Sequence, residues 1–206
     1  MSPALLILAG YLVGSVPTSH WVGRWVYGVE LREKGSGNLG ATNTFRVLGP
    51  KAAVPVLCVD VAKGWLPAAL FPAWDGSPGA EWAVAYGAAA ILGHAFSFWV
   101  GFKGGKGVAT GAGVFLALAP WALLLSFLLW VGGVLATRTV SVGSLLAAVT
   151  LPVWVVVAPG GDEPGTVAFA LCLSLFVVWA HRKNVHRLIR GEEPRFGVST
   201  GKVESV

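Results

Sequence analysis

Three short segments of the sequence gather residue types that bind anions. The first, residues 35–46, reads GSGNLGATNTFR. Its glycines expose backbone N–H groups, Ser36 and Asn43 add side-chain donors, and Arg46 supplies a planar guanidinium that suits a phosphate. The letters also satisfy a dinucleotide-binding pattern, but that pattern needs a preceding strand, whereas an apolar helical run precedes this segment. The segment therefore predicts an anion site, with a flexible turn as the alternative.

The second segment, residues 101–107, reads GFKGGKG. It is not a nucleotide-binding P-loop, because Gly107 stands where a serine or threonine would follow the lysine. The glycine-rich backbone of 104–107 lies beside Lys103 and Lys106 and leads into a helix N-terminus, which predicts an anion cradle. The alternative is a loop whose two lysines only anchor it at a membrane surface.

The third segment, HRKNVHR at residues 181–187, follows the last apolar run. On a helix, His181 and Asn184 are three residues apart and share one face. The alternative is the basic stop that routinely follows a last membrane span. Within the second apolar run, Asp60 and Lys63 also share a face. Charges inside a membrane usually pair or serve a function, so we expect these two to form an ion pair.

The composition explains where these segments must lie. Of the 206 residues, 55% are hydrophobic and only 12% are charged, against about 25% charged residues in a soluble domain. The mean hydropathy is +0.69. These values exclude a soluble globular domain and a disordered chain. The two cysteines, Cys58 and Cys172, fall inside apolar runs, so we expect buried, unreactive thiols rather than a disulfide framework.

Apolar runs recur along the chain, and most reach or approach the length that crosses a membrane. They occupy about residues 3–27, 53–73, 80–100, 107–119, 121–137, 140–158 and 164–181. Barrel-type alternation is absent, so the expected fold class is an all-α integral membrane protein. The stretch 107–137 is either one kinked helix or two helices that turn at Pro120. Only the turn places every basic loop on one side, as the positive-inside rule requires.

We therefore expect a compact bundle of seven transmembrane helices, with the N-terminus outside and the C-terminus in the cytoplasm. The fourth and fifth helices are short, so the 101–107 loop is expected to dip into the membrane. The loops expected outside carry no lysine or arginine, only Asp75, Glu81, Asp162 and Glu163. Residues 1–196 are expected to form a single domain, and residues 197–206 a flexible tail.

Together, the strings GSGNLGATNTFR, GHAFSFWVGFKGGKGVAT and HRKNVHRLIRGEE resemble the three signature segments of the bacterial acyl-phosphate:glycerol-3-phosphate acyltransferases, the PlsY type. The resemblance runs from Tyr11 to about Phe196. It implies a membrane enzyme that moves a fatty acyl group from acyl phosphate to the sn-1 hydroxyl of glycerol 3-phosphate. The products would be lysophosphatidic acid and phosphate, the first acylation step of phospholipid synthesis.

The same resemblance implies a setting for the enzyme. It would be a monomer in the lipid bilayer of the bacterial cytoplasmic (inner) membrane, with its site facing the cytoplasm. It would use no cofactor, and it would depend on another enzyme that makes acyl phosphate. The scattered acidic residues predict no metal site, and the basic residues lie between apolar runs rather than on one face, which argues against nucleic-acid binding.

The resemblance also implies roles for individual residues. The candidates that would line the site and orient or activate the glycerol hydroxyl are Ser36, His181 and Asn184. The candidates for phosphate binding are Arg46 and Lys106 first, then the weaker Lys103, the backbone of Gly104, Gly105 and Gly107, and the side chains of Asn43 and Ser141.

Two questions of mechanism and function stay open at this point. The proton acceptor is either His181 or a substrate phosphate oxygen, and we favour the phosphate. A covalent route through Ser36 and His181 lacks an evident orienting carboxylate. The alternative function is a transporter or channel for a phosphorylated solute, but outer loops without basic residues argue against anion translocation.

Overall fold

The chain is helical throughout the part that the structure describes. The computed structural model describes residues 1–76, 79–160 and 163–196. The helices are α1 (Pro3–Ser15), α2 (Thr18–Trp21), a π-helical turn (Val22–Val26), α3 (Ala41–Leu48), α4 (Pro50–Asp75), α5 (Ala80–Ala95), a 3₁₀ turn (Phe98–Val100), α6 (Val108–Leu118), α7 (Pro120–Thr137), α8 (Val140–Val157), α9 (Pro164–Ala180) and α10 (Arg182–Ile189). The predicted all-α class is therefore confirmed for these residues, whereas Asp162 and the predicted tail 197–206 lie outside them.

In the described part of the chain, five segments are long and apolar enough to cross a membrane. They are Pro3–Val26, Pro50–Asp75, Glu81–Val100, Pro120–Thr137 and Val140–Val157. A sixth is reached when α9 and α10, which meet at a bend of 54°, are taken as one span. The short apolar helix α6 would be the seventh element of the expected bundle. Length and composition thus support a multi-pass membrane protein, and the seven-span topology stays a prediction.

Two breaks shape the bundle. The helix that precedes α7 ends at Leu118, and Ala119 has extended backbone angles (φ −151°, ψ 71°), in agreement with the turn predicted at Pro120. The first apolar run was expected to be one helix, but α1 ends at Ser15 and the chain restarts after Pro17. Pro17 has no N–H to continue the hydrogen-bond ladder, so the helix breaks there.

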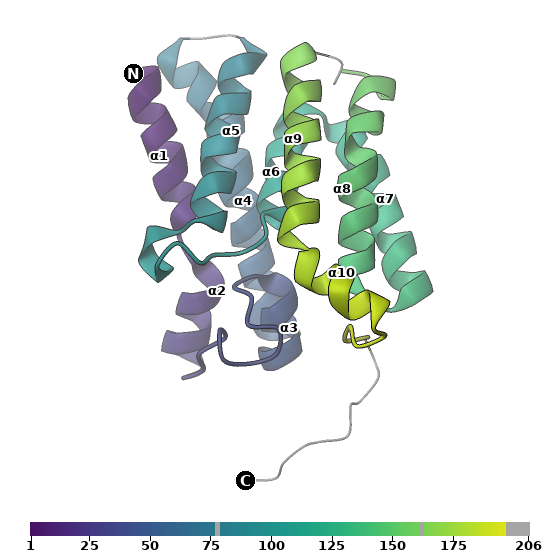
Figure 1. Cartoon of the computed structure of the whole chain (residues 1–206). Helices are drawn as coiled ribbons and strands as arrows, with labels where there is room; N and C mark the ends of the chain where they lie inside the picture. The colour runs from purple at the N-terminus through teal and green to yellow at the C-terminus, as the bar shows by residue number, and fades with distance from the viewer. Residues whose placement is uncertain (77–78, 161–162, 197–206) are drawn as a thin grey trace.

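Figure 1 shows where the candidate segments lie in the bundle. Helices α2, α3 and α10 gather at one end, opposite the N-terminus. The loop between α5 and α6 does not reach this end but lies within the length of the bundle. The three segments singled out in the sequence are thus carried toward one half of the molecule.

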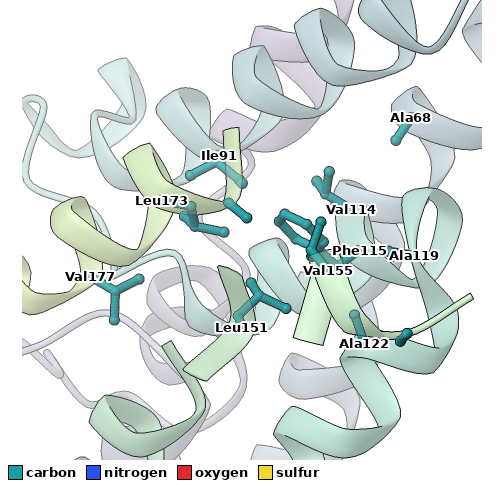
Figure 2. Packing of buried hydrophobic residues seen from close by; sticks show 12 residues of the cluster. Ala68, Ile91, Val114, Phe115, Ala119, Ala122, Leu151, Val155, Leu173 and Val177 are labelled. Atoms are coloured by element: carbon teal, nitrogen blue, oxygen red, sulfur yellow. The ribbon is translucent and has the colours of Figure 1, made fainter. Parts of the chain in front are cut away.

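A buried apolar cluster holds the C-terminal helices around α6. Phe115 and Val114 of α6 are fully buried and pack with Leu151 and Val155 of α8 and Leu173 of α9 (Figure 2). Outward-facing leucines, valines and tryptophans remain exposed on several helices, as a lipid-facing surface requires. Cys58 and Cys172 belong to this exposed surface, so the expectation that both thiols are buried was wrong. Both lie on outward faces of their helices, which are as apolar as the inward faces.

Helices α4 and α6 approach each other unusually closely. A Cβ atom on Gly64 would lie 2.0 Å from the Thr110 carbonyl oxygen, and one on Gly113 would lie 1.9 Å from that of Val61. Small residues permit such backbone contact between membrane helices. The expected ion pair is also confirmed in this part of α4, because Lys63 Nζ lies 2.7 Å from Asp60 Oδ1.

We expect Gly64→Ala to destabilise the protein because its new methyl group would overlap backbone atoms of α6. The expected loss of unfolding free energy is about 2 kcal/mol, as for other overpacked cores. Thermal unfolding in detergent measures it. Gly132→Ala is the matched control, because a Cβ atom there meets no atom within 4 Å. Equal melting temperatures for the two variants would contradict the close contact.

Candidate active site

A cavity of about 420 Å³ opens between the helices and receives residues from all three sequence segments. Its walls combine a polar end with a long apolar part. Eight of the eleven predicted site residues line it: Ser36, Asn43, Arg46, Lys106, Gly107, Ser141, His181 and Asn184. The structure therefore brings together segments that are up to 148 positions apart in the chain, between Ser36 and Asn184.

Asn43 organises the first segment rather than facing a ligand. Its Nδ2 donates to the carbonyl oxygens of Leu31 and Lys34, both at 3.1 Å, and its Oδ1 accepts the backbone N–H of Ser36 at 2.8 Å. The side chain thus closes the loop around Gly35, whose positive φ of 60° suits glycine. Asn43 fixes the backbone of Ser36, and Ser36 lines the cavity.

The glycine-rich loop delivers Lys106 to the cavity. Gly107 has a φ of 79° and turns the chain into α6. The half-buried Lys106 points to the third segment, where its Nζ donates a hydrogen bond to Asn184 Oδ1. Lys106 was a leading cation candidate on sequence, and the structure joins it directly to another candidate.

Three predicted phosphate ligands do not line the cavity. The N–H groups of Gly104 and Gly105 were expected to face an anion, but they donate to the carbonyl oxygens of Ala95 (3.0 Å) and His94 (3.1 Å). These donors are consumed within the fold, which corrects the expectation. Lys103 is exposed and also lies outside the cavity lining.

His181 lies at the bend between α9 and α10. The residue is buried, and its Nδ1 lies 2.8 Å from the carbonyl oxygen of Val177. A carbonyl oxygen can only accept, so Nδ1 carries the proton of this hydrogen bond. In the neutral ring, Nε2 is then the nitrogen that accepts a hydrogen bond. The bend of 54° swings α10 under the cavity, so that Asn184 reaches Lys106.

Glu193 is the site residue that the sequence did not single out. It lines the cavity, is only 8% exposed, and accepts hydrogen bonds from Asn184 Nδ2 (2.6 Å) and Arg187 Nε (2.7 Å). Burial raises the pKa of its carboxyl, but the hydrogen bonds from Arg187 and Asn184 outweigh burial and lower the pKa. An ionised carboxylate therefore fixes Asn184. The only sequence signal was a pair of acids, Glu192 and Glu193, at the end of a basic segment.

The polar end carries an excess of positive charge. Burial is the main cause that lowers the pKa of Lys106 to about 8, and repulsion from Arg187 and Arg46 adds to it, against the attraction of Glu193. Burial likewise lowers the pKa of Arg46, which lies on α3 at the solvent side of the cavity. Three cations around one carboxylate leave a net positive charge that an entering anion would neutralise.

The remainder of the cavity is an apolar arm. It is lined by residues of α4, α6, α7, α8 and α9, among them Leu57, Val61, Ala112, Phe115, Leu116, Leu123, Phe127, Ala148, Leu151 and Leu173. Leu57, Leu116 and Phe127 are also exposed on the outer surface, so the arm opens sideways where lipid would lie. One cavity thus joins an anion-binding end to an apolar arm. Within the described residues, no three metal-ligating side chains gather into a group.

The comparisons agree with these features. Residues 4–191 match the family model described as glycerol-3-phosphate acyltransferase. A glycerol-3-phosphate acyltransferase of Synechococcus sp. (strain JA-2-3B'a(2-13)) is 46% identical over 197 residues, with 96% of each chain covered. That of Anaeromyxobacter sp. (strain Fw109-5) is 45% identical, with 94% of this chain and 96% of the relative covered.

Solved structures of a membrane protein extend the match to the fold. The crystal structure of PlsY (YgiH), an integral membrane glycerol 3-phosphate acyltransferase, superposes in its glycerol 3-phosphate form with a TM-score of 0.88 at 38% identity, covering 96% of both chains. Its lysophosphatidic acid form gives a TM-score of 0.85. Fold and site thus define a multi-pass membrane protein whose cavity has a cationic end. The chain belongs to the glycerol-3-phosphate acyltransferase family, the PlsY family.

We expect anion binding at the polar end to weaken as pH rises through about 8, where Lys106 loses its proton. Sulfate is a suitable probe because its charge stays constant over this range. Its affinity, measured by calorimetry, should fall at least about threefold between pH 7 and pH 9.5. Lys106→Arg should abolish this fall, because arginine stays charged throughout. A fall of equal size in Lys106→Arg would assign it to another group.

Proposed function

We propose that the protein transfers a fatty acyl group from acyl phosphate to the sn-1 hydroxyl of glycerol 3-phosphate. The products are lysophosphatidic acid and inorganic phosphate. The observation that carries this proposal is the joining of a cationic end and an apolar arm in one cavity. The names of the relatives, and the two ligand forms of PlsY, support glycerol 3-phosphate as acceptor and lysophosphatidic acid as product.

Acyl phosphate suits this site as the donor. Both substrates are anionic and repel each other, and Arg46 and Lys106 can offset that repulsion at the polar end. The acyl chain would occupy the apolar arm, where burial of each CH₂ group contributes about 0.8 kcal/mol. Acyl phosphate is a mixed anhydride with a good leaving group, so the site needs to hold and align two substrates rather than form a covalent intermediate.

In the proposed step, the sn-1 oxygen attacks the acyl carbon and forms a new C–O bond. The bond from that carbon to the phosphate oxygen breaks, and phosphate leaves with its electron pair. The hydroxyl proton moves to a substrate phosphate oxygen. Nε2 of His181 accepts a hydrogen bond from the hydroxyl and orients it, because Nδ1 is held by Val177. Ser36 donates to substrate oxygen, and no cofactor takes part.

The proposal includes the setting of the enzyme. Helices α3 and α10, which carry the polar end, lie at the end of the bundle opposite the N-terminus (Figure 1). With seven spans, α6 among them, that end faces the cytoplasm of a bacterial inner membrane. In this proposal the enzyme acts as a monomer. Acyl phosphate would come from a separate enzyme.

The decisive experiment measures phosphate release from palmitoyl phosphate by the purified protein in detergent. We expect release that depends on glycerol 3-phosphate, with lysophosphatidic acid formed in equal amount. Lys106→Ala and Arg46→Ala should each lower turnover at least about tenfold, as loss of transition-state charge stabilisation does. No release by a folded preparation, with acyl-CoA and acyl carrier protein donors also inactive, would overturn the proposal. Uptake of phosphorylated solutes by sealed vesicles would then be measured.

The Ser36→Ala variant distinguishes the direct route from a covalent one. If Ser36 only donates a hydrogen bond, its loss slows turnover by roughly tenfold to a hundredfold and leaves residual activity. An acyl-enzyme route through Ser36 would lose essentially all turnover and would show a burst of phosphate without glycerol 3-phosphate. Rapid-quench measurement of phosphate in the wild type detects such a burst, whose presence would refute the direct route.

A further inference from the structure

A second polar cluster lies beneath the glycine-rich loop, and two of its members, Asp60 and His94, also line the cavity. Asp60 and Lys63 of α4 and His94 of α5 are 2%, 4% and 7% exposed. Lys63 Nζ lies 2.7 Å from Asp60 Oδ1, and His94 Nδ1 lies 3.8 Å from the same oxygen. Burying such charges in a membrane-embedded bundle is costly even when they are paired, and an apolar cluster would hold the helices at lower cost. The phosphate-binding candidates leave this cluster without a role.

The cluster touches the glycine-rich loop through His94. The loop bonds to the carbonyl oxygen of His94 through the N–H of Gly105, at 3.1 Å. A Cβ atom on Gly105 would lie 2.1 Å from His94 Nε2 and 2.7 Å from the carbonyl oxygen of Leu39. The imidazole is therefore in direct contact with the loop backbone. Lys106 follows Gly105 directly. The position of the His94 imidazole ring therefore constrains the position of the Lys106 backbone.

The cluster is also tied to the break in the first helix. Lys63 Nζ donates to the carbonyl oxygen of Val16 at 2.9 Å, just before Pro17. Ser97, beyond the end of α5, donates to the carbonyl oxygen of Ser15 at 2.5 Å. Backbone oxygens freed by the break thus receive donors from α4 and from the start of the loop. The cluster links the first helix, α4 and α5 immediately behind the loop.

We propose that Asp60, Lys63 and His94 are positioning residues that hold the backbone of Gly104 and Gly105, and through it Lys106, against the polar end of the cavity. The inference rests on the proposed function only in that Lys106 binds a substrate phosphate. It assigns the two glycines to contact with His94 rather than to contact with an anion. It also gives the buried charges of Asp60 and Lys63 a role, because an ion pair fixes the direction of a contact between helices as well as its length.

The test removes the ion pair as a unit. Asp60→Asn combined with Lys63→Met leaves no unpaired buried charge, so the double variant should fold. We expect it to lower kcat/KM at least about fivefold and to divide that loss between kcat and KM as Lys106→Ala does. Added to Lys106→Ala, it should cost less than about twofold more, because both changes act through one group. Fully multiplicative losses would overturn the proposal.

A second readout does not depend on catalysis. Acetic anhydride labels lysines, and mass spectrometry gives the labelling rate of Lys106 relative to the exposed Lys103 next to it. We expect this ratio to change at least about threefold in the double variant and in His94→Leu, which leaves the ion pair intact. This labelling ratio tests the positioning role even if the protein proves to have another activity. An unchanged ratio in folded His94→Leu would refute the proposal.

Tyr86→Phe is the matched control for both readouts. Tyr86 donates a hydrogen bond to Asp75 and so joins the same two helices, α5 and α4, at their other end. Its loss should lower the melting temperature while kcat/KM and the labelling ratio stay at the wild-type values. If Tyr86→Phe changed kcat/KM and the ratio as much as the double variant does, general loosening of α4 and α5 would explain the effect, and the positioning role would be rejected.

Discussion

The structure depends on holding positively charged side chains inside a bundle of mostly apolar helices. Lys106 is half-buried, and burial lowers its pKa to about 8, so the fold spends part of its stability on keeping this ammonium in place. Asn184 accepts its hydrogen bond, and the Glu193 carboxylate fixes Asn184 from the other side. One carboxylate does not balance the surrounding cations. The remaining positive charge can attract an anion into a cavity whose other walls are mostly apolar.

Broken helices make room for this arrangement. The break at Ala119 leaves α6 only 11 residues long, so its N-terminal loop lies within the bundle and carries Lys106 inward. The bend at His181 brings Asn184 under the cavity. The break at Pro17 frees the Val16 carbonyl oxygen for Lys63. Each interruption costs helical hydrogen bonds, and at Pro17 the freed carbonyl oxygen gains the Lys63 ammonium as its partner.

The glycines serve two different purposes. On α4 and α6, Gly64 and Gly113 let two backbones touch, which anchors the short helix firmly. In the loop, Gly105 gives room to the ring of His94. Gly101 and Gly107 have positive φ angles, and of these two Gly107 lines the cavity and turns the chain into α6. A glycine-rich segment therefore indicates close packing of the backbone as readily as it indicates an anion site.

The sequence by itself determined the helical class, the Asp60–Lys63 pair and the meeting of three segments at one site. These follow from local patterns: apolar run length, three-residue spacing on a helix, and the distribution of basic residues. The first helix break was missed because one apolar run was taken to continue across Pro17, although the polar Thr18, Ser19 and His20 follow it. The exposure of Cys58 was missed because its outward helix face is also apolar.

Only the tertiary structure decided what each polar group of the site does. The amides of Gly104 and Gly105 are taken by carbonyl oxygens at the end of α5, and Lys103 is left outside. Asn43 turns inward to hold Ser36, and Glu193 becomes part of the site. The physical reason is common to all of them. A donor or a charge faces a ligand only when no nearer partner satisfies it, and those partners come from distant parts of the chain.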